Sequence, residues 1–464
     1  MKVHLWLLGT ISFFIAGAGF SAPVRLTVYQ HDLALVQELR ELKPDQAGWV
    51  QLGDVSESAV VDSLRIEPSR GHVVQQTFRY EPPGLVALLT RHVGKRITVI
   101  HANPGNGAEQ TTTPLLVSVE AGRALVAEKD RIESLPISDL QWRFQFGGMP
   151  EGMTAEPQLR AQLADVRPQA AGLSYLTGGV GWRAHYRLVV GEARGNQQRG
   201  DFEARVEVHN NTTLNWPDAT VELIAGTLRQ VSPAPMARPK VAMMMRSVAE
   251  DVSGASPEPQ RAGFGDYHLY RLPVPVSLPA SERRDFHLLQ RDDVAVQRDY
   301  RFDFGNNRGL YQAIGADEPV PAAIRLRLDN SAAEPLPGGL WRVYGRGADG
   351  VLRLLGEDRS DNVPVGQEVR LEVGQAFDIT ARRVQTRFQR INNRETVSDW
   401  RVEVANAGDS GVNVELIDQL GVNWEISEES DQHDTPDAQR ARWTLSVPAH
   451  GQRVLSYQVT TRQR

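Results

Sequence analysis

The chain has 464 residues, of which 41% are hydrophobic and 23% are charged, and its formal net charge is −6. It contains no cysteine, which excludes disulfide scaffolds, cysteine-ligated zinc or iron–sulfur centres, thiol nucleophiles and diacylated lipoproteins. The net charge is small and both signs are mixed along the chain, so the sequence shows no basic patch of the kind that binds nucleic acid. This composition is typical of a folded protein, but it identifies no reaction.

The N-terminal segment has the three-part order of a secretory signal peptide. Lys2 precedes an apolar run over residues 5–18, and small residues follow. We expect cleavage after Ser21, because cleavage after Ala22 would place Pro23 next to the scissile bond. The alternative is an uncleaved anchor, but the run is shorter than the ~20 residues that span a bilayer. The sequence therefore predicts an exported, periplasmic chain that keeps no transmembrane anchor.

Residues 22–165 are predicted to form an N-terminal β domain with a small barrel-like part. Short runs of alternating apolar and polar residues, such as 96–100, are separated by glycine, proline and asparagine. One pattern differs from this alternation. Apolar residues recur at helical spacing over 159–166, and Pro168 follows, so we expect a short connecting helix there.

Residues 166–380 are predicted to form a central β-sandwich, because the alternating runs lengthen there, as in 182–190. Within them, residues 232–266 contain five prolines and little periodicity, which predicts a mobile loop. Residues 381–464 contain five alternating runs and are predicted to form an immunoglobulin-like sandwich. The predicted fold class is all-β, a multi-domain protein of β-sandwiches and a small barrel.

Two segments have the residue pattern of an active-site motif, but the structure predicted around them is not the one that the motif requires. Residues 345–350 fit the glycine pattern of dinucleotide-binding loops, and residues 408–411 read Gly-Asp-Ser-Gly, as near a protease nucleophile. Both lie between strand patterns, so we predict that both are turns. His185 and His209 fall within strands and are predicted to be structural. The same holds for the tryptophans, which we expect in the core rather than in a sugar-binding platform: Trp182, Trp216, Trp341, Trp400, Trp424 and Trp443.

Two clusters offer metal ligands. Residues 428–437 gather acidic side chains and His433, which suit a hard cation, although a solvated hairpin loop is the favoured interpretation. Met236 and residues 243–245 offer thioethers that suit Cu(I), although an apolar docking patch is favoured. The sequence therefore assigns no residue to catalysis, to a cofactor or to a metal.

Several separated blocks resemble the bacterial domain of unknown function 4139, which also occurs in mucoidy inhibitor A-like proteins. In order they are LSYLTGGVGWRAHY at 173–186, LPGGLWRVY at 336–344, LGEDR at 355–359 and GQAFDI at 374–379. The resemblance spans roughly residues 173–459, and the N-terminal third lacks the long coiled-coil insertion of some relatives. It implies an exported, β-rich protein of the bacterial envelope and brings no catalytic residues.

We expect a non-enzymatic binding or structural protein of the cell envelope, with another envelope protein or a glycan as partner. Open strand edges of the C-terminal domain are the expected docking route. The alternative is an envelope hydrolase acting on glycan or peptide, whose carboxylates the fold would bring together. Two carboxyl groups ~5–9.5 Å apart in an aromatic-lined cleft would favour it.

Overall fold

The computed structural model describes residues 24–30, 32–193, 196–226, 228–229, 260–264, 267–305, 308–330 and 334–462. The predicted signal peptide lies outside these residues, as do the methionines at 236 and 243–245. Most of the predicted loop 232–266 lies outside them too, but its residues Gln260–Phe264 form strand β17.

Strands make up almost all of the described elements, which confirms the all-β prediction. The helical elements are α1 (Leu85–Arg91) and two 3₁₀ turns, Val61–Ser63 and Arg308–Leu310. In the part of the chain that the structure describes, no helix has the length and apolar character needed to cross a membrane.

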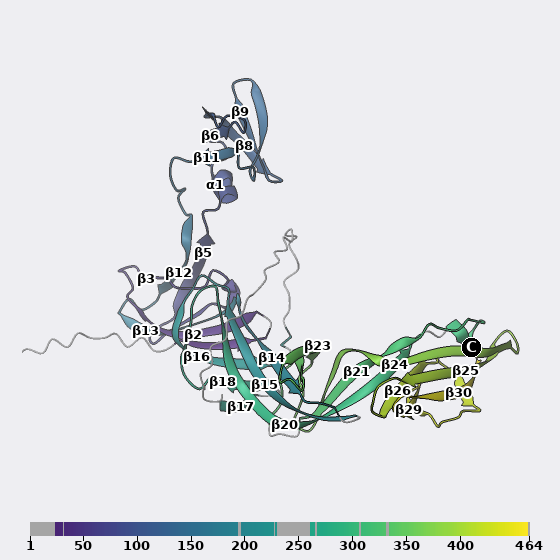
Figure 1. The fold of residues 1–464 in the computed structure, drawn as a ribbon. Coiled ribbons are helices and arrows are strands. Elements are labelled where there is room, and N and C mark those ends of the chain that lie inside the picture. The colour runs from purple at the N-terminus through teal and green to yellow at the C-terminus, as the bar shows by residue number, and fades with distance from the viewer. Residues whose placement is uncertain are drawn as a thin grey trace, which may run out of the picture.

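Two large sheets form the body of the protein (Figure 1). The first sheet consists of β1 (Arg25–Tyr29), β2 (Leu33–Leu42), β4 (Arg65–Pro68), β13 (Gln169–Gly178), β16 (Trp216–Ala225), β17, β18 (Tyr267–Arg271) and β19 (Val276–Leu278). The second consists of β14 (Val180–Val190), β15 (Gln197–Asn210), β20 (Glu282–Phe304), β21 (Val320–Asp329), β22 (Gly339–Arg346), β23 (Leu352–Ser360), β24 (Glu368–Arg390), β25 (Glu395–Asn406), β26 (Val412–Gln419), β27 (Trp424–Ser427), β28 (Asp434–Asp437), β29 (Arg440–Val447) and β30 (Gly451–Arg462).

A small domain projects from this body on a stalk (Figure 1). The stalk sheet consists of β3 (Trp49–Leu52), β5 (Val73–Glu81) and β12 (Thr154–Leu163). The small domain contains α1 and two three-stranded sheets, formed by β6 (Thr98–Ala102), β7 (Glu109–Thr112) and β11 (Trp142–Gln145), and by β8 (Leu115–Glu120), β9 (Arg123–Glu128) and β10 (Arg131–Pro136). It has its own apolar core, which includes Leu89, Ile97, Leu116 and Val126.

The helix predicted over 159–166 is wrong, because this segment lies largely in β12 between β3 and β5. Leu159, Ala161 and Leu163 are all buried, which is a period of two. Leu159 and Leu163 are four residues apart, and that spacing fits a helix face and a strand face equally well. Packing against two neighbouring strands decides between them.

Strands from both sides of the predicted boundary at residue 165 share the first sheet. β1 pairs in parallel with β16 and antiparallel with β2, and β2 pairs with β13. The side chains of Leu26 and Val28 on β1 are completely buried in the same core cluster as Trp182 and Val221. The N-terminal strands therefore complete the sandwich that the later strands build.

The tryptophans fill the cores as predicted. Trp182, Trp216, Trp341, Trp400 and Trp443 are buried, whereas Trp424 is half-buried. Trp341 stacks on Tyr186 with ring centroids 4.2 Å apart, and the Tyr186 hydroxyl donates to the Pro337 carbonyl. These rings are thus fixed in the interior, where they cannot act as a sugar-binding platform.

Three buried asparagines occupy equivalent corners of the fold, at the ends of β15 and β25 and directly after β21. We call Asn210, Asn330 and Asn406 the asparagine corners. Each side-chain amide donates to the carbonyl four residues later and to both carbonyls of a Leu-Pro or Val-Pro pair: Leu214, Leu278 and Pro279; Glu334, Val363 and Pro364; Ser410, Val447 and Pro448, at 2.8–3.5 Å. Each corner therefore ties two turns at one end of a sandwich unit.

The strands around each corner pair in the same way. The strand before the asparagine is antiparallel to the strand that follows the Pro turn, as in β15 with β20, β21 with β24 and β25 with β30. The strand after the asparagine is parallel to an earlier strand, as in β16 with β1, β22 with β14 and β26 with β20. The described chain thus contains three related units in tandem. We call them the first, second and third unit, after the corners Asn210, Asn330 and Asn406.

Two strands of 23 residues join these units. β20 pairs with β15 in the first unit and then with β21 in the second, and β24 pairs with β21 and then with β25 in the third. Because the same strand continues from one unit to the next, the units form an extended rod and are not separate domains joined by flexible linkers (Figure 1).

The third unit contains a buried ion pair. Arg383 and Asp418 lie 2.9 Å apart, and the Tyr457 hydroxyl donates to the same Asp418 oxygen at 2.5 Å. The Arg383 guanidinium stacks on the Trp400 ring at 3.7 Å. Burial raises the pKa of the Asp418 carboxyl, against the opposing effect of the Arg383 charge. The cluster links β24, β26, β25 and β30 across the sandwich.

We expect Asn406→Ala to lower the free energy of unfolding by about 2–4 kcal/mol, because it leaves buried carbonyl groups without a donor. Urea denaturation followed by tryptophan fluorescence measures this loss. Asn413→Ala is the matched control, since Asn413 lies exposed on β26 in the same unit. Equal stability of the two variants would show that the corner does not stabilise the unit.

We expect Asp418→Asn to lower the free energy of unfolding by about 3–5 kcal/mol, because it leaves the Arg383 charge buried without its carboxylate. Combining Arg383→Met, Asp418→Leu and Tyr457→Phe removes the whole cluster and should restore most of the stability. The same denaturation experiment compares them. If Asp418→Asn alone is as stable as the parent, the buried ion pair does not stabilise the third unit.

Candidate functional site

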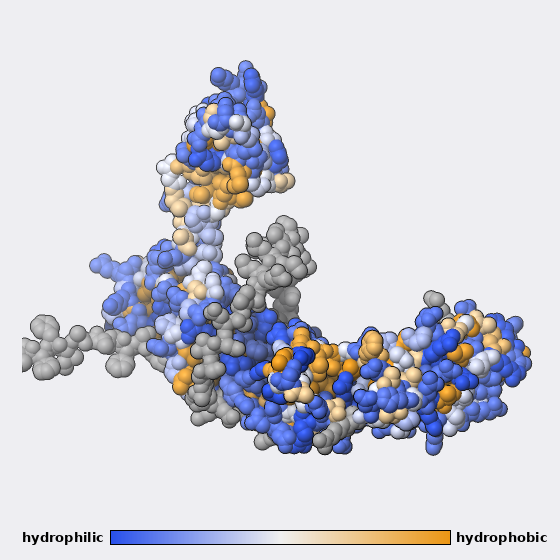
Figure 2. All heavy atoms as spheres, viewed as in Figure 1, coloured by the Kyte–Doolittle hydropathy of each residue, from blue (hydrophilic) through white to orange (hydrophobic). Residues whose placement is uncertain are grey.

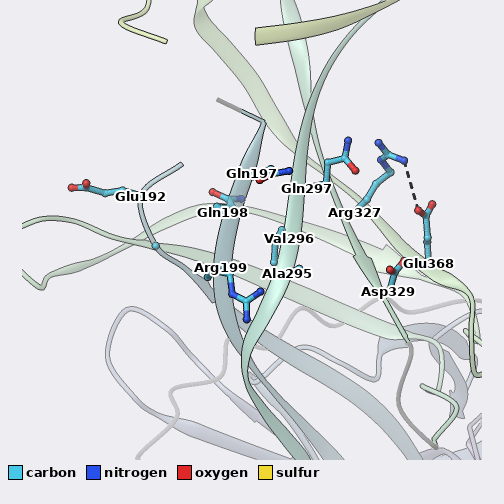
Figure 3. A pocket seen from close by; sticks show the side chains of 11 residues that line it. Glu192, Gln197, Gln198, Arg199, Ala295, Val296, Gln297, Arg327, Asp329 and Glu368 are labelled. Carbon is cyan, nitrogen blue, oxygen red and sulfur yellow. Dashed lines mark ion pairs between the residues drawn. The ribbon is translucent and has the colours of Figure 1, made fainter. Parts of the chain in front are cut away.

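A hollow of about 630 Å³ lies on the sheet where the first and second units meet (Figure 3). We call it the polar hollow. β15, β20, β21, the start of β24 and the turn after β14 contribute its walls. Its lining residues are Gly191, Glu192, Gln197, Gln198, Arg199, Ala295, Val296, Gln297, Arg327, Asp329 and Glu368.

The strand register places the polar groups in a row. Gln197 on β15 is paired with Gln297 on β20, and Gln297 is paired with Arg327 on β21. Val296, which precedes Gln297 on β20, is buried in the core, so the strand alternation turns the Gln297 side chain to the open face. The result is a row of two amides and a guanidinium across three strands.

Carboxylates neutralise both cations of the polar hollow. Arg327 pairs with Asp299 and lies 3.7 Å from Glu368, and its hydrogen bond to Asp299 raises the pKa of the guanidinium. Arg199 donates to Asp293 at 2.7 Å, and this hydrogen bond lowers the pKa of the Asp293 carboxyl. Asp299 also accepts a hydrogen bond from the exposed Gln297 amide at 3.3 Å, so the ion pairs and this amide hold each other in place.

This arrangement suits the binding of a polar ligand. Side-chain amides both donate and accept hydrogen bonds, so they match sugar hydroxyls or a peptide backbone equally well. The carboxylate of Glu368 is engaged by Arg327, and no aromatic side chain is among the lining residues. The polar hollow therefore does not match the aromatic-lined pair of carboxylates expected of the hydrolase alternative.

The two motif-like segments are turns, as predicted. Residues 345–350 comprise the end of β22 and the turn to β23, in which the Gly347 amide donates to the Val351 carbonyl and Gly350 has a φ of 75°. Residues 408–411 connect β25 and β26 beside the Asn406 corner, where the Gly408 amide donates to the Asn406 side chain at 3.0 Å. Neither segment leads into a helix.

Both histidines have structural partners. His209 is 5% exposed, and its Nε2 lies 3.0 Å from the Asp32 carboxylate. His185 is half-buried, 3.5 Å from Asp285, and burial lowers its pKa. These contacts agree with the structural role predicted for the two residues.

Ion pairs and hydrogen bonds engage most carboxylates of the acidic segment 428–437. Glu429 accepts a hydrogen bond from Trp443 Nε1 and lies 2.8 Å from His433. Three further carboxylates pair with arginines, which are Asp431 with Arg453, Asp434 with Arg442 and Asp437 with Arg440. The hydrogen bond from Arg440 lowers the pKa of Asp437. The carboxylates of this segment thus form ion pairs that stabilise the hairpin.

The polar hollow itself was missed by the sequence analysis. Its residues come from four strands, and each of them looks locally like an ordinary exposed strand position. The one local signal is the pair of consecutive amides Gln197 and Gln198, because Gln297 comes beside Gln197 only through strand pairing.

Arg327→Met should leave the fold intact, because the Arg327 side chain is one-third exposed and its ion pairs are weakened by solvent. We expect the free energy of unfolding to fall by less than about 1 kcal/mol in urea denaturation. A loss of several kcal/mol would show that the row is part of the folding core instead of a binding surface.

Comparison with known proteins identifies a family for this chain. No curated protein matches the chain. The family model described as "Domain of unknown function (DUF4139)" matches residues 171–463, a span that contains all three asparagine corners and the polar hollow. Since the match covers more than half of the chain, the protein belongs to the family of domain of unknown function 4139.

Proposed function

We propose that the protein is a non-enzymatic binding or structural component of the bacterial cell envelope, acting in the periplasm after export. The observation that carries this proposal is the polar hollow on a rod whose strands run unbroken from unit to unit. An open row of amides fixed on paired strands can hold a polar polymer without any rearrangement of the backbone.

The projecting small domain supports a role in binding. Leu85 and Val86 on α1 and Leu115 and Val117 on β8 are exposed, and apolar residues gather around α1 in Figure 2. Apolar groups displayed on a domain away from the body are typical of contact with another protein. The proposed partners are therefore an envelope protein at the small domain and an envelope polymer along the rod.

The C-terminal docking route proposed from the sequence has a specific geometry. β30 lies between β25 and β27, and the four-residue β27 ends the strand order of the sheet. β28, which pairs with β29 alone, is a second edge, so strand addition in the third unit would take place at β27 or β28 and not at the last strand of the chain.

We expect the mature chain to co-sediment with isolated envelope fractions. Replacing Gln197 and Gln297 together by alanine should weaken this binding several-fold, because the amides can no longer bond to the polymer. Gln51→Ala with Gln75→Ala is the matched control, since both glutamines lie exposed in the stalk sheet, outside the polar hollow and the small domain.

Two outcomes would contradict the proposal. One is a chain that stays fully soluble in the presence of envelope fractions. The other is turnover of an envelope glycan or peptide that a single carboxylate substitution abolishes, since it would establish the hydrolase alternative. Cell fractionation tests the periplasmic location, and a chain found only in the cytoplasm would refute it.

A further inference from the structure

We propose that a bulge in β24, residues 376–378, forms a saccharide-binding subsite in which Phe377 stacks on a sugar ring and Arg298 bonds to its oxygens. The inference deepens the proposed binding function and rests on it. The subsite lies at the seam between the second and third units, apart from the lining of the polar hollow.

The bulge arises from unequal strand lengths. Ala323 on β21 is paired with Gln375 on β24, and Pro321 is paired with Thr380, so four residues of β24 lie opposite one residue of β21. On the other side of β24, pairing with β25 begins only at Ile379. Residues 376–378 therefore have no opposite residue in either neighbouring strand. Bulges of this kind redirect side chains and are common beside binding sites.

The bulge exposes an aromatic ring to solvent. Phe377 is 95% exposed, whereas its neighbours Ala376 and Ile379 are 8% and 4% exposed. A phenyl ring gains from burial more than almost any other side chain, so a fold that buries the flanking residues and displays the ring forgoes that gain. The displayed ring is thus available to a ligand.

A hollow of about 380 Å³ lies beside the ring. Its walls come from β20, β21, the bulge and the turn at the Asn406 corner. The residues that line it are Ala193, Arg298, Tyr300, Ile324, Gln375, Ala376, Phe377, Asp378, Ile379, Asn406, Gly408, Asp409, Ser410 and Val412. Ligand sites commonly lie in such clefts between structural units.

Arg298 contributes an unused cation to this hollow. Its guanidinium lies 5.4 Å from the centre of the Tyr300 ring, and its buried Nε has no hydrogen-bond partner. Arg298 makes no ion pair within the described residues. Because Nε is buried, a ligand oxygen would accept from the other guanidinium nitrogens of this half-buried side chain.

The walls of the hollow are rigid. Asn196 donates to the Arg298 carbonyl at 2.6 Å and accepts a hydrogen bond from the Asn413 amide at 2.8 Å, which ties β20 to β26. Asn406 fixes the opposite wall through the Gly408 amide and the Ser410 carbonyl. A site held in this way loses little conformational entropy when a ligand binds.

The mixture of groups favours a saccharide. The C–H face of a sugar ring packs on an aromatic ring, while its hydroxyls pair with planar side chains such as guanidinium and carboxylate. Asp378 and Asp409 would repel a ligand of purely anionic character, and a purely apolar peptide side chain would leave Arg298 without a partner. A sugar satisfies the ring, the cation and the carboxylates together.

The test measures binding of short oligomers of N-acetylglucosamine, of glucose and of a hexuronic acid to the mature chain by titration calorimetry. A phenylalanine-containing peptide serves as the competing class of ligand. We expect at least one neutral oligomer to bind, and to bind more tightly than the hexuronic acid oligomer that Asp378 and Asp409 repel. Phe377→Ala should weaken this binding about tenfold or more, and Phe377→Trp should retain it. Arg298→Met should weaken it as well. Leu140→Ala in the small domain is the matched control, since Leu140 is 96% exposed.

Each contrary result has a distinct meaning. Equal oligomer binding by the parent, Phe377→Ala and Arg298→Met would overturn the subsite, while co-sedimentation with envelope fractions would still support the proposed function. Failure of the parent to bind any oligomer would overturn the subsite as well. Peptide binding that depends on Phe377, without sugar binding, would replace the saccharide by a protein partner. Because Phe377 is exposed, its substitution leaves the fold in place, and circular dichroism checks this.

Discussion

Three buried amide groups organise this protein. Each asparagine corner satisfies backbone carbonyls from two separate turns, and these carbonyls would otherwise be buried without donors. An aspartate could not replace the asparagine, since a carboxylate has no donor to offer to a carbonyl. The corners fix where each pair of strands ends, and thereby set the register of the sheets between them.

The shared strands give the units a common frame. β20 pairs with strands of all three units and β24 with strands of two, so the orientation of one unit is transmitted to the next through hydrogen-bonded backbone. The core clusters follow the same logic, because Ile324 packs against both the cluster of the first two units and that of the third. The seams between units, where pairing partners change, are also where the two hollows lie.

The sequence patterns predicted those features that depend only on residues close together in the chain. The alternation of apolar residues predicted the strands and the burial of Trp182 and Trp400, and glycine-rich turns were predicted at 345–350 and 408–411. Pairing between distant segments escaped prediction, because nothing near Leu26 indicates that it lies beside Val221. The same reason hid the bulge, since Phe377 is an ordinary strand residue until the length of β21 is known. The corners had a sequence signal, an asparagine that ends a strand and a later Leu-Pro or Val-Pro pair, but their unequal spacing along the chain conceals the repeat.

The continuity of β20 and β24 also has a mechanical consequence. A pull along the rod reaches each seam through a covalent strand, so no seam depends on side-chain contacts alone. The hydrogen bonds between β20 and its neighbours β15 and β21 run across the strands, and tension along the strand therefore loads many of them together in shear. The stalk formed by β5 and β12 is a narrow ribbon, and a force on the small domain would twist or peel it first. The molecule thus combines a stiff beam with a compliant arm, and strain applied at the arm is absorbed there before it reaches the beam.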